Sequence, residues 1–503
     1  MRVCLLTREY PPETGWGGIA TFSYHLAHGL KELGHEVVVV SLAQRAASMQ
    51  IDDGITVHRV CGYKVPGEFG AIFSSMPYSR TVLEACTALW QKFLDLHEQK
   101  PFDVVDTPEL LSDGLYTAIT SAAPLVIRLY TPHFKFLAEK LHGTSNNFDH
   151  QFVAMLERLA LSQADAITSP SDDLAAFVAQ DLGCSLNRIA IIRNPIDPQV
   201  FSPEGTTALP MTTKKRVLFV GRLEERKGVK YLVQAIPGIL EQCPDVEFII
   251  IGDDTINEAG GKQSTSAELQ AFLKHEKALA AVTFIDRVPL ADLPAYYRSC
   301  DLCIVPSLYD NSPYTCLEAM ACGRPVVGTS GGGTKEYVTH CESGLIVGPG
   351  DSEALQSAVV TLLKNDELRL RMARQARQDV LDKFQRREIA RQTLELYENA
   401  QQKFAKRTTR LYLKPTDHAL PDAAVFLYSF DKMIYDMLYQ HSYRFRIGHW
   451  MRMAKARPRM FAARVVLRLA KAGTAVVTRN RVSQPAFVRW LERQIQERET
   501  AVR

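Results

Sequence analysis

The chain has 503 residues and a formal net charge of +3, with 46% hydrophobic and 23% charged residues. One hydrophobic core rarely reaches this size, so we expect an ordinary globular protein with two domains and an appendage. No run approaches the 18 apolar residues that suggest a membrane span, and VCLLT after Arg2 is too short for a secretory signal, so we expect neither. The ten cysteines lie scattered, mostly inside apolar runs, and predict reduced core residues of a cytoplasmic protein.

Short apolar, β-branched runs alternate with helical patterns over the first 380 residues. In the first half the predicted strands are 2–7, 36–42, 55–60, 102–107, 125–130, 166–171 and 188–194. In the second half they are 216–221, 246–253, 282–286, 302–307, 325–330 and 344–349. Their continuous hydrophobicity is typical of parallel strands covered by helices on both faces. The segment SPEGTTALPMTT (202–213) separates the halves. We therefore predict an α/β protein with two doubly wound, Rossmann-like domains that face each other across a cleft.

Four loops that follow predicted strands carry candidate binding residues. In YPPETGWGGIATF (10–22), Gly15, Gly17 and Gly18 permit close approach of a ligand ahead of a helix whose first amides favour an anion. The alternative for this loop is a flexible connection. In VGRLEERKGVKYL (220–232), Arg222 and Lys227 suit a diphosphate, and the alternative is a solvated basic loop.

The third loop, PSLYDNSPYTCLEAMACGRPVV (306–327), places Asp310 and Glu318 eight positions apart, where their carboxylates can accept hydrogen bonds from hydroxyl groups. Between them, a polar loop leads into a helix that ends at Gly323, and amides at the helix start can face a phosphate. The candidate ligand contacts between the two carboxylates are Asn311, Ser312, Pro313, Tyr314, Thr315, Cys316 and Leu317. The fourth loop, SGGGTKEYV (330–338), enters another helix and carries Glu336. The four loops together indicate a cleft that holds phosphate and polyol.

Over roughly residues 1–400 the sequence resembles the retaining GT-B glycosyltransferases of glycosyltransferase family four. The phrases that carry the resemblance are PPETGWGGIATFSYHLAHGLKELGHEVVVV, RNPIDPQVF, VGRLEERKGVKYLVQAIP, VPSLYDNSPYTCLEAMACGRPVV and SGGGTKEYV followed by SGLIVGPGD. The resemblance implies a nucleoside-diphosphate sugar as donor co-substrate, with no cofactor and no required metal. It also implies retention at the anomeric carbon, with a role in polysaccharide biosynthesis. The expected domains are 1–205 on the acceptor side and 206–385 on the donor side, with a helix at 386–405 crossing back to the first domain.

Residue roles follow from the resemblance position by position. Arg222 and Lys227 match the pair that binds the donor diphosphate and stabilises it as it leaves. Asp310 and Glu318 match the two carboxylates of the EX7E motif, which contact the donor sugar and the ribose hydroxyls. Gly17 and Gly18 match the loop that faces the phosphate and the acceptor, and Glu336 matches the glutamate after the paired glycines.

Three positions depart from the family pattern. Asp310 keeps the charge of the expected glutamate but is one methylene shorter, which reduces its reach toward a sugar hydroxyl. Tyr130 stands where the family often has histidine near the sugar, and His133 is a candidate replacement, with an incidental loop histidine as the alternative. The phrase RNPID replaces Asn-Gly-Val-Asp, so that Pro195 alters the turn while Asp197 is kept.

The C-terminal segment differs from the rest in charge. Residues 401–503 contain 21 Lys/Arg and 7 Asp/Glu, a balance of +14, which leaves −11 for residues 1–400. We expect 406–503 to form a basic, mostly helical extension. One interpretation is a surface at 440–481 that docks on anionic lipid at the inner face of the membrane, near a lipid-linked acceptor. The others are a site for a protein or nucleic-acid partner, with no specific nucleic acid expected, and a helical appendage packed on the acidic main body.

Two functional alternatives to the retaining glycosyltransferase stay open. One is a catalytically weakened nucleotide-sugar-binding or scaffold protein of the same fold. The other is an epimerase or phosphorylase on the same architecture, which the loops at 222–227 and 310–318 disfavour. The acceptor is a glycan, a lipid-linked sugar or a small molecule. Cys300 and Cys303 form one CxxC without a second pair, so we expect neither a metal nor a redox site.

Overall fold

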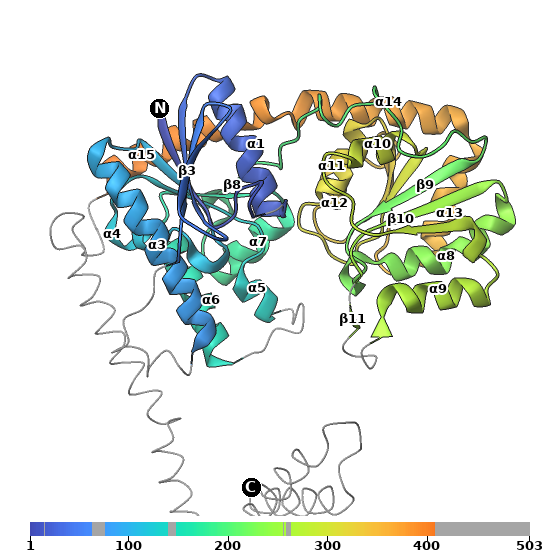
Figure 1. Ribbon diagram of the computed structural model, residues 1–503, viewed down its shortest axis with the longest axis horizontal. Helices are drawn as coiled ribbons and strands as arrows, with labels where there is room; N and C mark the ends of the chain where they lie inside the picture. The colour runs from blue at the N-terminus through green and yellow to red at the C-terminus, as the bar shows by residue number, and fades with distance from the viewer. Residues whose placement is uncertain (15, 63–75, 139–146, 255, 258–262, 408–503) are drawn as a thin grey trace, which may run out of the picture. The chain divides into compact units, whose positions relative to one another are not determined.

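The computed structural model describes residues 1–407 except 15, 63–75, 139–146, 255 and 258–262. The predicted basic extension, including 440–481, therefore lies outside the described residues from residue 408 onward. The described chain forms two large sheets covered by helices (Figure 1). The first has the order β3-β4-β2-β1-β5-β6-β7-β8 and the second the order β13-β10-β9-β14-β15-β16. Apart from β3, all neighbouring strands in both sheets are parallel.

The strands of the first sheet are β1 (Arg2–Leu6), β2 (Glu36–Leu42), β3 (Ser48–Asp52), β4 (Ile55–Val60), β5 (Val104–Pro108), β6 (Leu125–Arg128), β7 (Ala166–Ser169) and β8 (Ile189–Ile191). The helices of this half are α1 (Gly18–Glu32), α3 (Pro77–Gln99), α4 (Leu115–Thr120), α5 (His133–Ala138), α6 (Phe148–Gln163) and α7 (Asp172–Asp181).

The strands of the second half are β9 (Lys215–Val220), β10 (Val246–Ile251), β13 (Val282–Ile285), β14 (Leu302–Val305), β15 (Val326–Thr329) and β16 (Gly344–Val347), with a small hairpin of β11 (Ile256–Asn257) and β12 (Gln263–Ser264). The helices are α8 (Val229–Gln242), α9 (Thr265–His275), α10 (Leu293–Arg298), α11 (Tyr314–Ala321), α12 (Thr334–Tyr337), α13 (Ser352–Lys364), α14 (Asp366–Lys383) and α15 (Arg386–Ala405).

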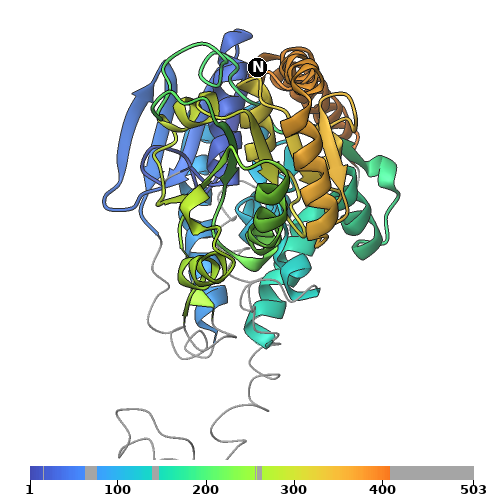
Figure 2. The same ribbon diagram turned by 90° about the vertical axis from the view of Figure 1, so that its right-hand side faces the viewer.

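The second sheet is buried on both faces, as its continuous hydrophobicity predicted. Val217 and Phe219 of β9 pack in a core with residues of α8 and α13, whereas Leu218 between them packs on the other face with residues of α11 and α14. Successive strand residues point to opposite faces, so an unbroken apolar run serves two cores at once. Figure 2 turns this half toward the viewer, with its covering helices.

The long helix α15 leaves the second half and packs on the first. In Figure 1 the orange helices α14 and α15 lead from the second sheet back to the first. Ile389 and Tyr397 of α15 are buried in a core shared with Phe22 and Leu26 of α1 and with residues of β1, β2 and β4. The phenol of Tyr397 also donates a hydrogen bond to the carboxylate of Asp106, at 2.8 Å.

The prediction of two doubly wound α/β domains is confirmed. Every predicted strand is present, with ends that differ by a few residues. Among the strands of the described residues, the sequence analysis missed only β3 and the β11–β12 hairpin. Within the described ranges, no helix is both long and apolar enough to cross a membrane.

Candidate functional site

Both sheets reverse their strand order at the position where the candidate loops leave them. In the second sheet the chain proceeds from β9 outward through β10 and β13, then returns to β14 on the other side of β9. In the first sheet the same reversal lies between β1 and β5. Open α/β sheets bind ligands at such a switch point, beyond the carboxyl ends of the strands. Arg222 and Lys227 follow β9, Asp310 follows β14, and Gly17 and Gly18 follow β1.

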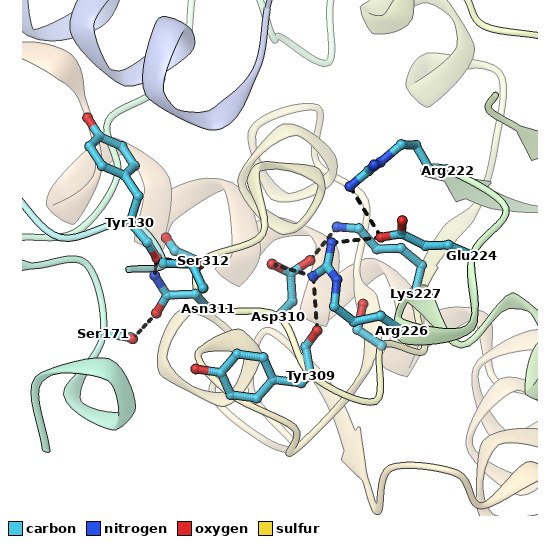
Figure 3. A network of polar contacts seen from close by, with 12 residues as sticks. Tyr130, Ser171, Arg222, Glu224, Arg226, Lys227, Tyr309, Asp310, Asn311 and Ser312 are labelled. Carbon is cyan, nitrogen blue, oxygen red and sulfur yellow. Dashed lines mark hydrogen bonds and ion pairs between the residues drawn. The ribbon is translucent and has the colours of Figure 1, made fainter. Parts of the chain in front are cut away.

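The structure joins Lys227 to Asp310 directly (Figure 3). Their charged groups form an ion pair of 2.5 Å, and a second cation, Arg226, lies 3.8 Å from the other oxygen of Asp310. Burial by itself raises the pKa of Asp310, but the charges of Lys227 and Arg226 outweigh it, so that the pKa lies below its usual value. Asp310 is therefore ionised near neutral pH.

Arg222 belongs to the same charged group through Glu224. The carboxylate of Glu224 accepts hydrogen bonds from Arg226 at 2.8 Å and from Arg222 at 3.4 Å. The Arg222 side chain is 53% exposed, whereas the side chains of Arg226 and Lys227 are each 21% exposed. Three cations and two carboxylates thus lie together at the switch point, and Arg222 is the most exposed of the cations.

Glycines let the loops of this site touch backbone to backbone. Gly228 has a φ of +67°, and a side-chain carbon there would lie 1.9 Å from the carbonyl oxygen of Pro306. Gly332 has a φ of +80°, and a side-chain carbon would lie 2.2 Å from the carbonyl oxygen of Asp310. Both positions therefore require glycine, because any side chain would push the β14 loop away.

Glu318 lies in α11, where it is buried and has a hydrogen-bond partner outside the ion pair. Its carboxylate accepts a hydrogen bond of 2.7 Å from the phenol of Tyr297 in α10. Burial raises the pKa of Glu318 to about 7, although the Tyr297 hydrogen bond and the charge of Lys227 both act to lower it. A carboxyl group that titrates near neutral pH is a feature common at functional sites.

The residues between the two carboxylates divide into loop and helix. Pro313 caps α11, which begins at Tyr314 and continues through Thr315. Cys316 and Leu317 are fully buried in the core beneath the sheet. A ligand role for Cys316 and Leu317 would consequently rest on their backbone rather than on their side chains.

Asn311 and Ser312 face the first half of the molecule. The amide of Asn311 donates to the carbonyl of Tyr130 and accepts from the hydroxyl of Ser171 (Figure 3). The carbonyl of Ser312 accepts a hydrogen bond from Asn194 at 3.2 Å. The loop that carries Asp310 is thus bound to both halves.

Tyr130 and His133 are held by neighbours in the first half. The ring of Tyr130 packs edge-on against Phe22, and Figure 3 shows it turned away from Asp310. His133 is buried beside Tyr78 and His150, with 3.0 Å between the ring nitrogens of the two histidines. Burial and the neighbouring His150 lower the pKa of His133 to about 4, so His133 is neutral near pH 7.

Gly17 and Gly18 are exposed at the start of α1, where Gly17 is the N-cap. A side-chain carbon at Gly18 would meet no atom within 4 Å. Packing within the described chain therefore does not explain the glycine at position 18, in contrast to Gly228 and Gly332. Gly15 lies outside the described residues.

Glu336 of α12 contacts the first half instead of the ion pair. Its carboxylate accepts hydrogen bonds from the backbone amides of Asp172 and Asp173 and pairs with Arg193 at 2.5 Å. These amides belong to the first turn of α7, so Glu336 caps a helix of the other half.

The sequence analysis missed four residues of this region: Glu224, Arg226, Tyr297 and Tyr309. Arg226 carried a visible signal, since it lies between the two predicted cations. The two tyrosines carried none, because their partners are distant in sequence. The lone CxxC is buried, and burial raises the pKa of Cys300 to about 12, which leaves a protonated and unreactive thiol.

Comparisons with known proteins cover both halves of the described chain. The family model described as Glycosyltransferase Family 4 matches residues 16–200, and that described as Glycosyl transferases group 1 matches residues 208–379. An uncharacterised glycosyltransferase of Methanocaldococcus jannaschii is 25% identical over 80% of this chain and 98% of its own length. Glycogen synthase of Mycobacterium tuberculosis is 26% identical over 84% of this chain and 100% of its own.

Solved structures share the fold. Sucrose-phosphate synthase from Thermosynechococcus elongatus has a TM-score of 0.63 at 21% identity and covers 81% of this chain and 100% of its own. HepE from Anabaena in complex with UDP-glucose has a TM-score of 0.58 at 19% identity and covers 79% of this chain and 100% of its own. With one family model on each half of the described chain, the protein belongs to glycosyltransferase family four and has the GT-B fold.

Proposed function

We propose that the protein transfers a sugar from a nucleoside-diphosphate sugar to a carbohydrate or lipid-linked acceptor, with retention at the anomeric carbon and without a metal. The observation that carries the proposal is the cluster of Arg222, Arg226 and Lys227 at the β9–β14 switch point, beside two carboxylates. The HepE structures with UDP and UDP-glucose support a nucleotide-sugar donor.

The cations suit the charge that develops during transfer. Cleavage of a glycosyl–phosphate bond places negative charge on the departing diphosphate, and preorganised cations stabilise that charge. Asp310 holds the ammonium of Lys227, which has three N–H donors and so keeps donors available for a phosphate. The exposed guanidinium of Arg222 can approach the diphosphate bidentately.

The carboxylates position the donor. In this assignment Asp310 binds a sugar hydroxyl and Glu318 binds the ribose hydroxyls, while the leaving phosphate takes the proton of the acceptor hydroxyl on the same face of the sugar. No side chain has to act as a covalent nucleophile, in contrast to retaining glycosidases.

Nucleotide release tests the proposal. Purified protein is incubated with a panel of nucleoside-diphosphate sugars, with and without an acceptor extract, and products are identified by mass spectrometry. We expect Arg222→Ala and Lys227→Ala each to reduce turnover about 100-fold, the scale for removal of one transition-state donor. Glu318→Ala should lower turnover by weakening the binding of the donor.

Lys274→Ala is the matched control, because Lys274 lies in the last turn of α9, shortly before the start of β13, whereas the candidate site lies beyond the carboxyl ends of the strands. Unchanged turnover in all three site variants contradicts the proposal. Donor binding without turnover in the wild type favours the alternative, a nucleotide-sugar-binding protein that has lost activity.

A further inference from the structure

The two residues on either side of Asp310 both bind the opposite half of the molecule. Tyr309 and Asn311 direct their side chains to residues of the first half, whereas Asp310 between them directs its carboxylate to Lys227 of its own half (Figure 3). Such alternation along three consecutive residues makes the position of one carboxylate dependent on both halves.

Tyr309 contacts the first half through both its hydroxyl and its ring. Its hydroxyl donates a hydrogen bond of 3.0 Å to the carboxylate of Asp173 in α7. Its ring lies 4.6 Å from the ammonium of Lys135, a buried lysine that also lies over the ring of Phe177. A buried cation against two aromatic faces is a stabilising arrangement that fixes the tyrosine ring.

Asn311 makes a pair of side-chain hydrogen bonds with the first half. Its NH₂ group donates to the carbonyl of Tyr130, after β6, and its oxygen accepts from Ser171, the N-cap of α7. Asn311 is buried, so both polar ends of its amide are satisfied by the other half rather than by solvent.

The backbone at Asp310 is fixed within its own half. Its N–H donates to Gly331 at 3.2 Å, and its carbonyl accepts from Gly333 at 2.8 Å. Neither the loop nor the carboxylate can therefore shift without breaking contacts on both sides. The reach of the side chain at position 310 is set by the place where these contacts hold the loop.

We propose that Tyr309 and Asn311 are positioning residues, which hold the loop so that the short side chain of Asp310, and not a longer one, reaches the donor sugar. This inference rests on the proposed function. It accounts for an aspartate where the family pattern has glutamate: the loop position and the side-chain length form a matched pair. If the loop is released, the longer glutamate becomes the better residue.

The test is a set of kinetic measurements with the donor that the wild type uses. We expect Asn311→Ala to lower kcat about tenfold while KM for the donor changes less than about twofold, because the donor diphosphate site stays intact. Asp310→Glu should lower kcat in the wild-type background. In the Asn311→Ala background, Asp310→Glu should instead raise kcat several-fold. Tyr309→Phe removes only the hydroxyl and is a milder change. In the Tyr309→Phe background, Asp310→Glu should also raise kcat instead of lowering it.

Arg386→Met is the matched control, because Arg386 also joins the two halves but through Glu32 and Asp197, and not through the start of α7 that Tyr309 and Asn311 contact. In that background Asp310→Glu should lower kcat as it does in the wild type. An equal loss from Asp310→Glu in all backgrounds overturns the inference. A reversal with Arg386→Met also overturns it, because it would indicate a general loosening of the interface between the halves. Absence of turnover by the wild type with every donor contradicts the proposed function instead.

Discussion

Glu318 is a buried carboxyl group whose protonation changes within the physiological range. Burial raises its pKa to about 7, whereas Asp310, paired with Lys227, stays ionised. In the proposed function Glu318 binds ribose hydroxyls, and an ionised carboxylate accepts such hydrogen bonds more strongly than a neutral acid does. The affinity for the donor should therefore depend on pH through this one residue.

We expect donor affinity to increase about tenfold between pH 6 and pH 8. Affinity should rise with pH because the raised pKa leaves the carboxyl group mostly protonated below pH 7 and mostly ionised above it. Calorimetric titration measures the donor affinity at each pH. An intact nucleotide sugar is used because its diphosphate diester does not titrate between pH 6 and pH 8. Tyr297→Phe removes a hydrogen bond that lowers the pKa of Glu318, so the midpoint should move to higher pH.

Glu318→Gln serves as the control for the pH dependence. The amide cannot ionise, so the variant should bind the donor more weakly than the wild type at pH 8 and with little change between pH 6 and pH 8. An unchanged slope in Glu318→Gln would show that another group carries the pH dependence.

At the residue scale, the sequence predicted positions better than partners. Arg222, Lys227, Asp310 and Glu318 could be placed at strand ends and helix starts because local patterns define those elements. That Asp310 pairs with Lys227 could not be predicted, since the contact depends on how two loops 83 residues apart approach each other. The partners of Tyr309 and Asn311 could not be predicted for the same reason, because they too lie on segments distant in sequence.

At the scale of elements, one buried arginine anchors the glycine loop that follows β1. The guanidinium of Arg59, from β4, donates to the carbonyls of Tyr10 at 2.9 Å and Pro11 at 3.0 Å. It also pairs with Glu13 at 2.9 Å, and its side chain is fully buried. A strand two positions away in the sheet thus fixes the start of the loop that leads to Gly17.

Arg59→Met should lower the free energy of unfolding by about 3 kcal/mol. The methionine fills most of the volume but leaves two carbonyls and a carboxylate without their buried donor, which costs energy on this scale. Denaturant unfolding measures the change, and Arg45→Met, at an exposed arginine after β2, is the control. A change within about 0.5 kcal/mol, the range of ordinary surface substitutions, would mean that the loop is held by other contacts.

Elements buried on both faces were predictable, and exposed ones were not. The parallel strands appear as continuous apolar runs because both faces are covered. Strand β3 is mostly exposed, so its residues carry no such signal. Its remaining signal is Asp53–Gly54, which makes the two-residue turn into β4 with φ values of 46° and 80°. An Asp-Gly pair between two short segments is a hairpin signature.

At the scale of the whole described molecule, the first sheet is covered by α15, a helix that follows the second half in the sequence. The core under α1 includes Ile389, Ala390, Leu396, Tyr397 and Ala400, all from α15. The fit is close, since a side-chain carbon at Gly29 of α1 would lie 2.4 Å from the carbonyl oxygen of Arg386. In the other direction, Ile196 and Phe201 pack in the core of the second sheet. The two halves are therefore linked by exchanged segments as well as by their interface.

Because of these exchanged segments, we expect the two halves to differ in their ability to fold alone. A fragment of residues 1–205 lacks α15 and exposes the apolar face that α15 covers. Burial of a large apolar side chain contributes about 1.5–3 kcal/mol, so loss of this face costs on the order of 10 kcal/mol. That is comparable to the whole net stability of a typical domain, about 5–15 kcal/mol. The fragment should therefore show no cooperative thermal unfolding, whereas residues 195–385, which keep Ile196 and Phe201, should unfold cooperatively alone.

The decisive comparison restores the helix. Fusing residues 386–407 to the end of fragment 1–205 through a flexible Gly/Ser linker should recover a cooperative transition in calorimetry, because the apolar face is covered again. The same fusion with Tyr397→Asp and Ile389→Asp should not recover it, since both side chains are buried in the shared core. Cooperative unfolding of 1–205 without α15 would show that the first sheet is complete by itself and that α15 only joins the halves.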